Sequence, residues 1–428
     1  MSRPGAHRVA IVGAGIAGLA TATALRDAGH HDVVILEARD RIGGRIWTSR
    51  IGDDVPVDLG ASWIHGIEGN PITRLAAENG IDLSATDYDN ASVLFHGSAE
   101  AAPNRDGLVR GFWALARRRP NAPLRAVYER YAASLSDSDR HVLAYVLNTA
   151  VEHEFGADIA DLSFRSVNGG EEFAGHDAVF AAGYRQIVDG LAEGLDIRLE
   201  HPVTEVDYAG PGVVLRTASG TPFEAAVAVV TVPLGVLKAG SLVFRPDLPR
   251  RTRRAIDELG MGVLNKTCLL FDDVFWEKDV ELIGFVGTET GQWAETLNLY
   301  PYTGRPILMM FNAGSYGARI EAMSDAEIVA QALASLEVMY GPVPSPSDVL
   351  ITRWRSDRWS HGSYSYVPVG ASFRQHLDLA RPVDSKVFFA GEATHQDHPA
   401  TVHGAFLSGV RAARQVAVVA ARGTGRLA

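Results

Sequence analysis

The residues whose spacing points most directly to chemistry lie near the N-terminus, where Gly13, Gly15 and Gly18 form the pattern G-x-G-x-x-G. The first glycine permits a tight turn, the second lets backbone approach a pyrophosphate, and the third lets a helix pack closely on a strand. Glu37 follows at the spacing where an acid hydrogen-bonds a ribose. These residues predict a dinucleotide-binding site; the alternative is a glycine turn that only joins a strand to a helix.

The elements expected around these glycines fit the binding site. Residues 8–12 and 32–36 are short apolar runs typical of strands, and residues 19–25 continue as an apolar helical stretch. A strand, a glycine turn and a helix in this order would place the pyrophosphate at the helix N-terminus, where free N–H groups and the helix dipole favour an anion.

Composition narrows the class of protein. The chain has 428 residues, 46% of them apolar and 21% charged, which suits a two-domain soluble enzyme. A net charge of −11 argues against a nucleic-acid partner and weakly favours a small cationic one. The single cysteine, Cys268, excludes an internal disulfide and a cysteine-based metal site, and we expect no metal. No apolar run approaches the ~20 residues of a membrane span, so we expect a cytoplasmic protein, with its oligomeric state left open.

A second cluster follows the glycine turn directly. Arg41 and Arg45 flank the pair Gly43-Gly44, and arginine forks suit phosphate geometry. Together with the glycine pattern and Glu37, this cluster resembles the N-terminus of flavin-dependent amine oxidases, which bind FAD. The resemblance covers about residues 9–75, 183–240, 261–276 and 352–411, and its local motifs are as close to lysine-specific histone demethylases as to polyamine oxidases.

The resemblance implies where FAD would bind. Monoamine oxidases carry a flavin-linking cysteine where this chain has Ser363, so we predict non-covalent FAD. Given the FAD that the resemblance implies, a glutamate after a strand could bond a cofactor hydroxyl, and free N–H groups at a helix start could hold the flavin N1–C2=O edge. The expected cofactor-binding residues are Gly13, Gly15, Ala17, Gly18, Glu37, Arg39, Gly44, Arg45, Gly60, Ala61, Ser62, Trp63, Val203, Trp354, Gly391, Glu392, Thr401 and Val402.

Lys266 is the residue that we expect to be catalytic. It stands just before an apolar strand in a chain that contains very few lysines. A lysine at a strand start is usually exposed and inert. The segment is similar to the one that carries the flavin-proximal lysine of the two families named above, which holds a water at flavin N5.

The resemblance also implies substrate-binding roles for His65, Glu154, Tyr364 and Thr401. His65 would face the substrate, although a core histidine is an equally open alternative. Tyr364 would form one wall of the amine cage. Thr401 stands where monoamine oxidases have a second cage tyrosine, and the absence of that tyrosine argues against monoamine oxidase activity. The pair Glu171-Glu172 would attract a diammonium substrate near a pocket, or do nothing on a surface turn.

The expected fold is α/β, with a Rossmann-like FAD-binding domain of the glutathione-reductase-like type and an inserted α+β substrate domain. The first comprises residues 1–75, 182–244 and 371–428, and the second residues 76–181 and 245–370. Apolar spacing predicts helices over 109–116, 123–135 and 137–151, with Asp137 as an N-cap, and residues 227–232 as a strand buried on both faces.

We therefore expect oxidation of a primary or secondary amine, with a polyamine or diamine as the first candidate, by hydride transfer to flavin. The expected products are an imine or aldehyde and hydrogen peroxide, with dioxygen as acceptor. One alternative is an L-amino-acid or monoamine oxidase, although no arginine stands out as a carboxylate clamp. Another is a non-catalytic flavin-binding protein. The short middle of the chain, without the long helical insertion of the demethylases, argues against a chromatin role.

Overall fold

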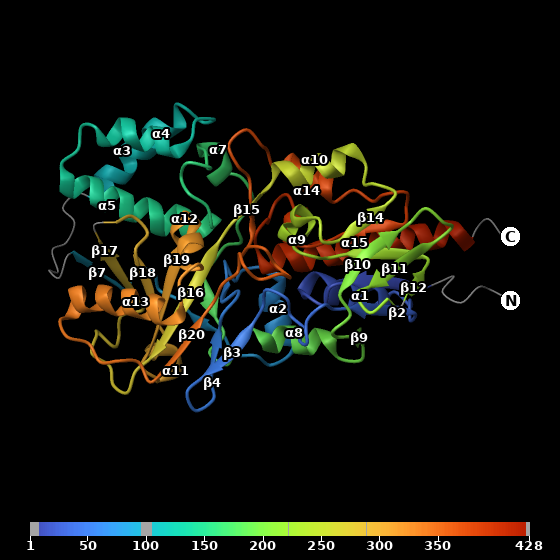
Figure 1. The fold of residues 1–428 in the computed structure, drawn as a ribbon, viewed down its shortest axis with the longest axis horizontal. Helices are drawn as coiled ribbons and strands as arrows, with labels where there is room; N and C mark the ends of the chain where they lie inside the picture. Colours follow the sequence, from blue (N-terminus) through green and yellow to red (C-terminus); the bar gives the residue numbers. More distant parts are fainter. Residues whose placement is uncertain (1–7, 96–104, 221, 288, 425–428) are drawn as a thin grey trace.

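Two β-sheets organise the molecule, one at each end of the long axis in Figure 1. The computed structural model describes residues 8–95, 105–220, 222–287 and 289–424. Chain segments far apart in sequence alternate between the two ends, as the colours in Figure 1 show. The domain boundaries given above stay predictions.

The first sheet has five parallel strands in the order β22-β13-β1-β2-β9. Their chain segments are widely separated, so the sheet forms only when these parts of the sequence meet. The predicted strands at 8–12, 32–36 and 227–232 are confirmed, each within a few residues. The bounds are β22 (Val387–Phe389), β13 (Val227–Val230), β1 (Val9–Val12), β2 (Val33–Leu36) and β9 (Asp196–Arg198).

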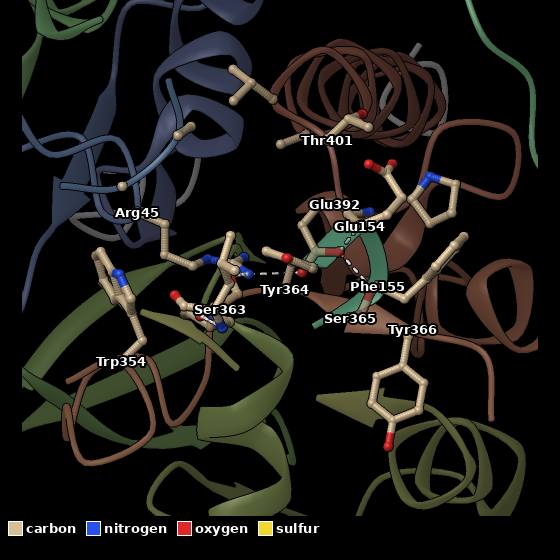
Figure 2. Close-up of a pocket in the computed structure, with 18 of the residues that line it drawn as sticks. Arg45, Glu154, Phe155, Trp354, Ser363, Tyr364, Ser365, Tyr366, Glu392 and Thr401 are labelled. Atoms are coloured by element: carbon tan, nitrogen blue, oxygen red, sulfur yellow. Dashed lines mark hydrogen bonds and ion pairs between the residues drawn. The ribbon is translucent and has the colours of Figure 1, made fainter. Parts of the chain in front are cut away.

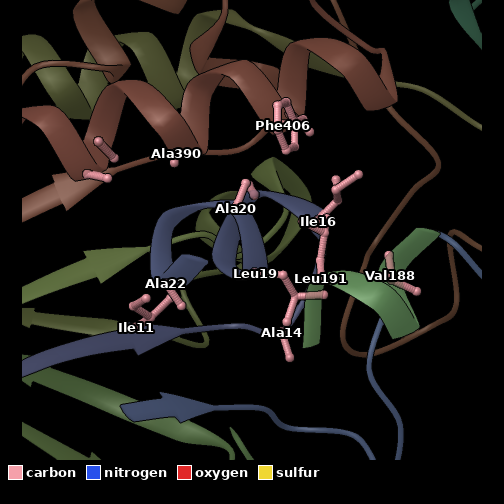
Figure 3. Packing of buried hydrophobic residues seen from close by; sticks show 14 of the residues in the cluster. Ile11, Ala14, Ile16, Leu19, Ala20, Ala22, Val188, Leu191, Ala390 and Phe406 are labelled. Atoms are coloured by element: carbon pink, nitrogen blue, oxygen red, sulfur yellow. The ribbon is translucent and has the colours of Figure 1, made fainter. Parts of the chain in front are cut away.

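Both faces of this sheet are buried, and alternate residues of each strand pack into different cores. Val9 and Ile11 contact α1 (Ile16–Asp27) and its neighbours, and Figure 3 shows α1 lying between the sheet and α15 (Val402–Thr424). Ala10 and Val12 face a core shared with a four-stranded sheet. That sheet contains β12 (Pro222–Ala225), β11 (Val213–Thr217), β10 (Val203–Asp207) and β14 (Val243–Arg245).

The second large sheet has six strands in the order β20-β16-β19-β18-β17-β7. Neighbours are antiparallel except β17 and β7, which are parallel. One face packs on α13 (Asp325–Tyr340), and the other turns toward the first segment of the chain. Its strands are β20 (Asp348–Ile351), β16 (Leu264–Leu270), β19 (Ile307–Ala313), β18 (Glu295–Asn298), β17 (Leu282–Val286) and β7 (Ala91–Phe95).

Three helices cover one end of the six-stranded sheet, where the sequence predicted them: α3 (Arg105–Arg117), α4 (Leu124–Ala132) and α5 (Asp137–Leu147). The predicted cap is wrong by one residue, because the Ser136 hydroxyl accepts from the Asp139 backbone N–H and Asp137 is already helical. A π-helix, Asn148–Glu152, then leads into α6 (His153–Phe155).

The remaining elements are short. They are β3 (Thr48–Ile51), β4 (Val55–Asp58), β5 (Trp63–Ile64), α2 (Pro71–Glu78), β6 (Ser84–Ala85), α7 (Phe164–Val167), β8 (Ala178–Val179), α8 (Arg185–Ala192), α9 (Leu234–Ala239), α10 (Arg250–Glu258), β15 (Gly260–Met261), α11 (Tyr300–Thr303), α12 (Gly314–Ile320), β21 (Ser365–Tyr366), α14 (Arg374–Leu379) and a 3₁₀ turn, Glu392–Thr394. Among the described helices, none has both the length and the apolar character that crossing a membrane requires.

Candidate active site

A cavity of about 1660 Å³ extends from the glycine turn of the parallel sheet to the six-stranded sheet. Lys266 and the residues predicted above to bind cofactor or substrate line it, except Gly18 and Arg41. Gly18 lies behind the turn. The structure therefore brings these residues to one place, while the role of each stays a proposal.

The glycine turn presents backbone to the cavity. A side chain on Gly18 would meet the Gly13 carbonyl oxygen at 2.0 Å, so this glycine allows α1 to pack against the turn. A Cβ on Gly15 would meet no protein atom closer than 3.9 Å, and the space beside it is the cavity itself. The Glu37 carboxylate, which is buried, accepts from the N–H groups of Ala14 at 2.7 Å and Arg39 at 2.9 Å.

Two helices begin at the cavity. The first residues of α1, and those of α15 around Thr401 and Val402, line it. Figure 2 shows Thr401 at the start of α15. The Thr401 hydroxyl accepts from the Gly404 N–H at 3.0 Å and donates to the His398 carbonyl, so its side chain caps the helix. Two positive dipole ends at one cavity suit a ligand with separate anionic groups.

The arginines predicted to clamp a phosphate are engaged with protein groups. Arg45 donates to Glu392 at 2.8 Å and to the Ser363 carbonyl at 2.9 Å (Figure 2). Arg39 makes a two-pronged pair with Asp357 at 2.7 and 2.9 Å. Arg41 does not line the cavity; its guanidinium lies 4.9 Å from the Trp47 ring centre.

Glu392 is buried and fully engaged. Besides Arg45, the Ser365 hydroxyl at 2.5 Å and the Ala400 N–H at 3.0 Å donate to its carboxylate. Burial by itself raises the pKa of Glu392, but Arg45 and Ser365 outweigh it and the pKa is lowered. The carboxylate is therefore a fixed negative charge beside the start of α15.

Lys266 is buried, not exposed, and its three N–H donors each have a partner. They reach the carbonyls of Asp58 at 2.8 Å and Gly60 at 2.6 Å, and the Ser62 hydroxyl at 2.6 Å. The 58–62 turn therefore fixes the ammonium group in the cavity wall. Burial lowers the pKa of Lys266 to about 8, although the nearby Asp58 charge opposes the shift.

Two aromatic rings flank this lysine. The ring centres of Trp63 and Phe311 each lie 5.9 Å from Lys266 Nζ, and the Trp63 indole N–H donates to Thr86. Trp354 is buried and donates to the Leu59 carbonyl at 3.2 Å. Ser363 exchanges hydrogen bonds with the backbone of Leu264, which ties its hydroxyl to the lysine strand.

Strand pairing places Lys266, Phe311 and Glu295 in a row across β16, β19 and β18. Directly paired residues share a face of a sheet, and all three line the cavity. Phe311 and Glu295 are not among the site residues predicted from the sequence, and no local pattern marks either one. His153 Nδ1 lies 3.5 Å from a Glu295 carboxylate oxygen.

His65 and Glu154 also line the cavity. His65 Nδ1 contacts the Asp177 carboxylate at 2.7 Å, and the His65 side chain is 47% exposed, so it is not a core histidine. Asp177 is also not among the site residues predicted from the sequence. The Tyr364 hydroxyl donates to the His153 carbonyl, beside Glu154 (Figure 2). Glu171 and Glu172 line the cavity as well.

Among the described residues, no group of three or more His, Cys, Asp or Glu side chains is arranged to hold a metal ion. The cavity instead offers backbone, helix starts and a buried ammonium at one end, with aromatic rings and carboxylates at the other. That arrangement can hold a dinucleotide cofactor beside a cationic organic substrate.

Comparison with known proteins agrees with this arrangement. Residues 16–417 match the family of flavin-containing amine oxidoreductases. Polyamine oxidase 4 of Oryza sativa subsp. japonica is 35% identical over 431 residues, which cover 95% of this chain and 87% of that protein. The Homo sapiens lysine-specific histone demethylase 2 is 33% identical over 439 residues, covering 96% of this chain but 53% of that longer protein.

The fold also has a solved counterpart. A double mutant of putrescine oxidase superposes with a TM-score of 0.78 at 22% identity, covering 96% of this chain and 99% of that one. The matches span nearly the whole chain and include both sheets. The chain therefore belongs to the flavin-containing amine oxidoreductases, and its cofactor is FAD.

Proposed function

We propose that this protein is an FAD-dependent oxidase of diamines or polyamines, with a glutathione-reductase-like FAD domain. The proposed substrate class rests on the row of Lys266, Phe311 and Glu295 within the cavity. The relatives named above support the reaction type.

The residues present fit non-covalent FAD. Gly15 and Gly44 line the cavity without side chains, and a Cβ on Gly15 would meet no protein atom closer than 3.9 Å. Glu37 would hydrogen-bond a ribose, and the starts of α1 and α15 would face the pyrophosphate and the flavin N1–C2=O edge. Bound FAD would accept a hydride from the carbon next to the amine nitrogen and pass the electrons to dioxygen, giving hydrogen peroxide and an imine that water hydrolyses.

Lys266 would act as a fixed cation beside the reacting centre. Its three contacts with Asp58, Gly60 and Ser62 prevent the ammonium from turning, so no reorganisation is needed as negative charge develops nearby. The Trp63 and Phe311 rings lie beside this charge and would keep water away from it, which strengthens its field.

Glu295 would hold a second nitrogen of the substrate. Adjacent strands are separated by about 4.8 Å, so Lys266 and Glu295 stand about 10 Å apart at their backbones, with the Phe311 ring between them. A substrate with its reacting carbon near Lys266 and a cation at Glu295 would lie extended over that ring. A monoamine would leave Glu295 unpaired.

More carboxylates lie around the same end of the cavity. Asp177, Glu154 and Glu295 all line the cavity, and besides burial the negative charge of each raises the pKa of Tyr88. Glu171 and Glu172 continue the acidic lining. Such a concentration of negative charge attracts polycations and raises their local concentration.

The test is anaerobic titration of the flavin-loaded protein with putrescine, spermidine, spermine, n-butylamine, an L-amino acid and a dimethyl-lysine peptide. The proposal expects putrescine or a polyamine to bleach the flavin absorption at far lower concentration than n-butylamine does. Bleaching by the peptide alone or by the amino acid alone would identify that compound's class as the substrate in place of diamines and polyamines. No bleaching by any of these compounds would favour a non-catalytic flavoprotein.

A further inference from the structure

The row of Lys266, Phe311 and Glu295 continues to the edge of the six-stranded sheet. Glu295 pairs with Gly284 of β17, and Gly284 pairs with Val93 of β7. Directly paired residues share a face of a sheet, and Gly284 and Val93 also line the cavity. With about 4.8 Å between adjacent strands, the backbone of Val93 lies about 10 Å beyond that of Glu295. The cavity floor therefore extends past the site proposed for a second substrate nitrogen.

A tyrosine from another element fills one position of this row. A Cβ on Gly284 would lie 2.1 Å from the Tyr145 hydroxyl oxygen and 2.9 Å from the ring carbon that carries it. Tyr145 belongs to α5, which lies against β17 (Figure 1), and it lines the cavity. The hydroxyl therefore occupies the place of a side chain between Glu295 and Val93.

Gly284 makes this contact possible. It is the middle residue of β17 and has no positive φ, so its backbone conformation does not require glycine. A glycine inside a strand weakens the strand and often marks the close approach of another group. The other neighbour of a Cβ at this position would be Val93 Cγ2, at 3.1 Å. Among the described residues, the group that the missing side chain admits is therefore the Tyr145 phenol.

The phenol places a neutral group next to the Glu295 carboxylate. Burial raises the pKa of Tyr145 and the Glu295 charge raises it further, while Arg105 on α3 opposes the shift. Because this pKa lies above the ordinary 10.0, the hydroxyl keeps its proton and offers an ammonium group no charge to pair with. Arg105 also lines the cavity, and its charge would repel an ammonium group. Beyond Glu295, the row therefore offers a second cation neither a carboxylate nor open space.

We infer that Tyr145 ends the substrate channel at Glu295 and so selects short aliphatic diamines over longer ones. A diamine with one nitrogen at the reacting centre and the other at Glu295 stops before the phenol. A longer chain would carry its second ammonium past Glu295 into the position that the hydroxyl fills, where it would lose the carboxylate and clash with the ring. This inference rests on the proposed amine oxidation and narrows its substrate class.

The first test compares Tyr145→Ala with the wild-type protein, both loaded with flavin, as kcat/KM for putrescine, cadaverine and a ten-carbon terminal diamine. The wild-type protein should prefer the two short diamines. In Tyr145→Ala, we expect kcat/KM for the ten-carbon diamine, relative to that for putrescine, to rise at least about tenfold, because removal of the ring opens the row toward β7. Tyr145→Leu, which keeps an apolar side chain on α5, should change the ratio in the same direction and serves if the alanine variant folds poorly.

Tyr128→Ala is the matched control, because Tyr128 is a half-buried tyrosine on α4 that does not line the cavity. Its ratio should equal the wild-type ratio. An unchanged ratio in Tyr145→Ala, or a wild-type protein that oxidises the ten-carbon diamine as well as putrescine, would overturn the inference and leave the proposed function in place. Absence of flavin bleaching with every diamine would instead overturn the proposed function, and the inference with it.

The second test needs no turnover and measures whether the phenol occupies the place of a side chain at position 284. Gly284→Ala adds a methyl group 2.1 Å from the Tyr145 hydroxyl, so we expect it to lower the denaturant midpoint of unfolding. In the Tyr145→Ala background the same methyl group has space, and the shift should be smaller. Gly210→Ala, where no atom lies within 4 Å of a Cβ, is the control and should shift neither midpoint. Equal shifts for Gly284→Ala in both backgrounds would refute the contact and the inference built on it.

Discussion

The two walls of the cavity differ in the groups that they present to a ligand, which are backbone groups on one wall and side chains on the other. The wall on the parallel sheet presents backbone, through Gly13, Gly15 and the starts of α1 and α15. The wall on the six-stranded sheet presents side chains, with Lys266, Phe311 and Glu295 contributed by three strands. A backbone wall can bind only one shape of ligand, whereas a side-chain wall can change specificity one residue at a time without loss of the fold.

The largest effect on stability and flavin binding is expected at Gly18, because this glycine lets α1 pack against the turn that forms the backbone wall. In Gly18→Val, the new Cβ would lie 2.0 Å from the Gly13 carbonyl oxygen, so α1 must move off the turn. We expect a loss above about 3 kcal/mol in the free energy of unfolding and loss of bound flavin. Denaturant unfolding and the visible spectrum measure both.

Gly210→Ala is the control for this change, because no atom lies within 4 Å of a Cβ there. It should stay within about 0.5 kcal/mol of wild type. A Gly18→Val protein that keeps its flavin and its stability would show that close packing of α1 does not shape the backbone wall.

On the side-chain wall, Lys266→Met should leave the fold and the flavin in place but remove the fixed cation. We expect turnover with the best amine to fall about 100- to 1000-fold, the usual cost of losing one preorganised electrostatic group. Stopped-flow reduction and reoxidation rates would show which half-reaction depends on it. Lys278→Met, at an exposed position, should change neither rate; normal rates in Lys266→Met would remove the lysine from the mechanism.

Glu295→Gln should affect specificity more than rate. The amide keeps the shape of the carboxylate but loses its charge, so we expect KM for putrescine to rise about 10- to 100-fold, the range for one charged contact of 1.4 to 2.8 kcal/mol. KM for n-butylamine should stay the same, because that substrate has no second cation. Glu224→Gln, exposed on β12, is the control. Equal changes for both substrates would contradict a second-nitrogen site.

The smallest effect compares two helix caps. Thr401→Ala removes the hydroxyl that accepts from Gly404, and Ser136→Ala removes the one that accepts from Asp139. Each should lower the free energy of unfolding by about 1 kcal/mol. Only Thr401→Ala should also weaken FAD binding, because α15 begins at the cavity and α5 is capped elsewhere. Flavin dissociation on dilution distinguishes them, and equal flavin retention would place Thr401 outside the cofactor site.

Local sequence predicted the backbone wall well. Gly13, Gly15, Gly18 and Glu37 have fixed spacings because one turn, one helix and two strands connect them, and the structure places all but Gly18 on the cavity. The resemblance to flavin-dependent amine oxidases predicted Lys266, Tyr364 and the start of α15 as parts of the site, although their segments are far apart in the chain. The cap at Ser136 was misjudged because two polar residues compete at the same helix start.

The sequence did not predict Asp177 or Glu295, and the physical reason is register. Glu295 reaches the cavity because it pairs with Phe311 on a neighbouring strand, and Asp177 because the pairing of β5 with β8 brings it next to His65. Likewise, the sequence predicts no strand over residues 91–95, and β7 forms there by pairing with β17.

The sequence by itself determined that the chain binds a dinucleotide, since short-range spacing and backbone sterics decide a glycine turn. Tertiary structure alone decided which acids stand opposite the lysine and the histidine. Strand pairing joins residues through hydrogen bonds that carry no local sequence signal, and a shift of one residue would turn each of these side chains to the other face of its sheet.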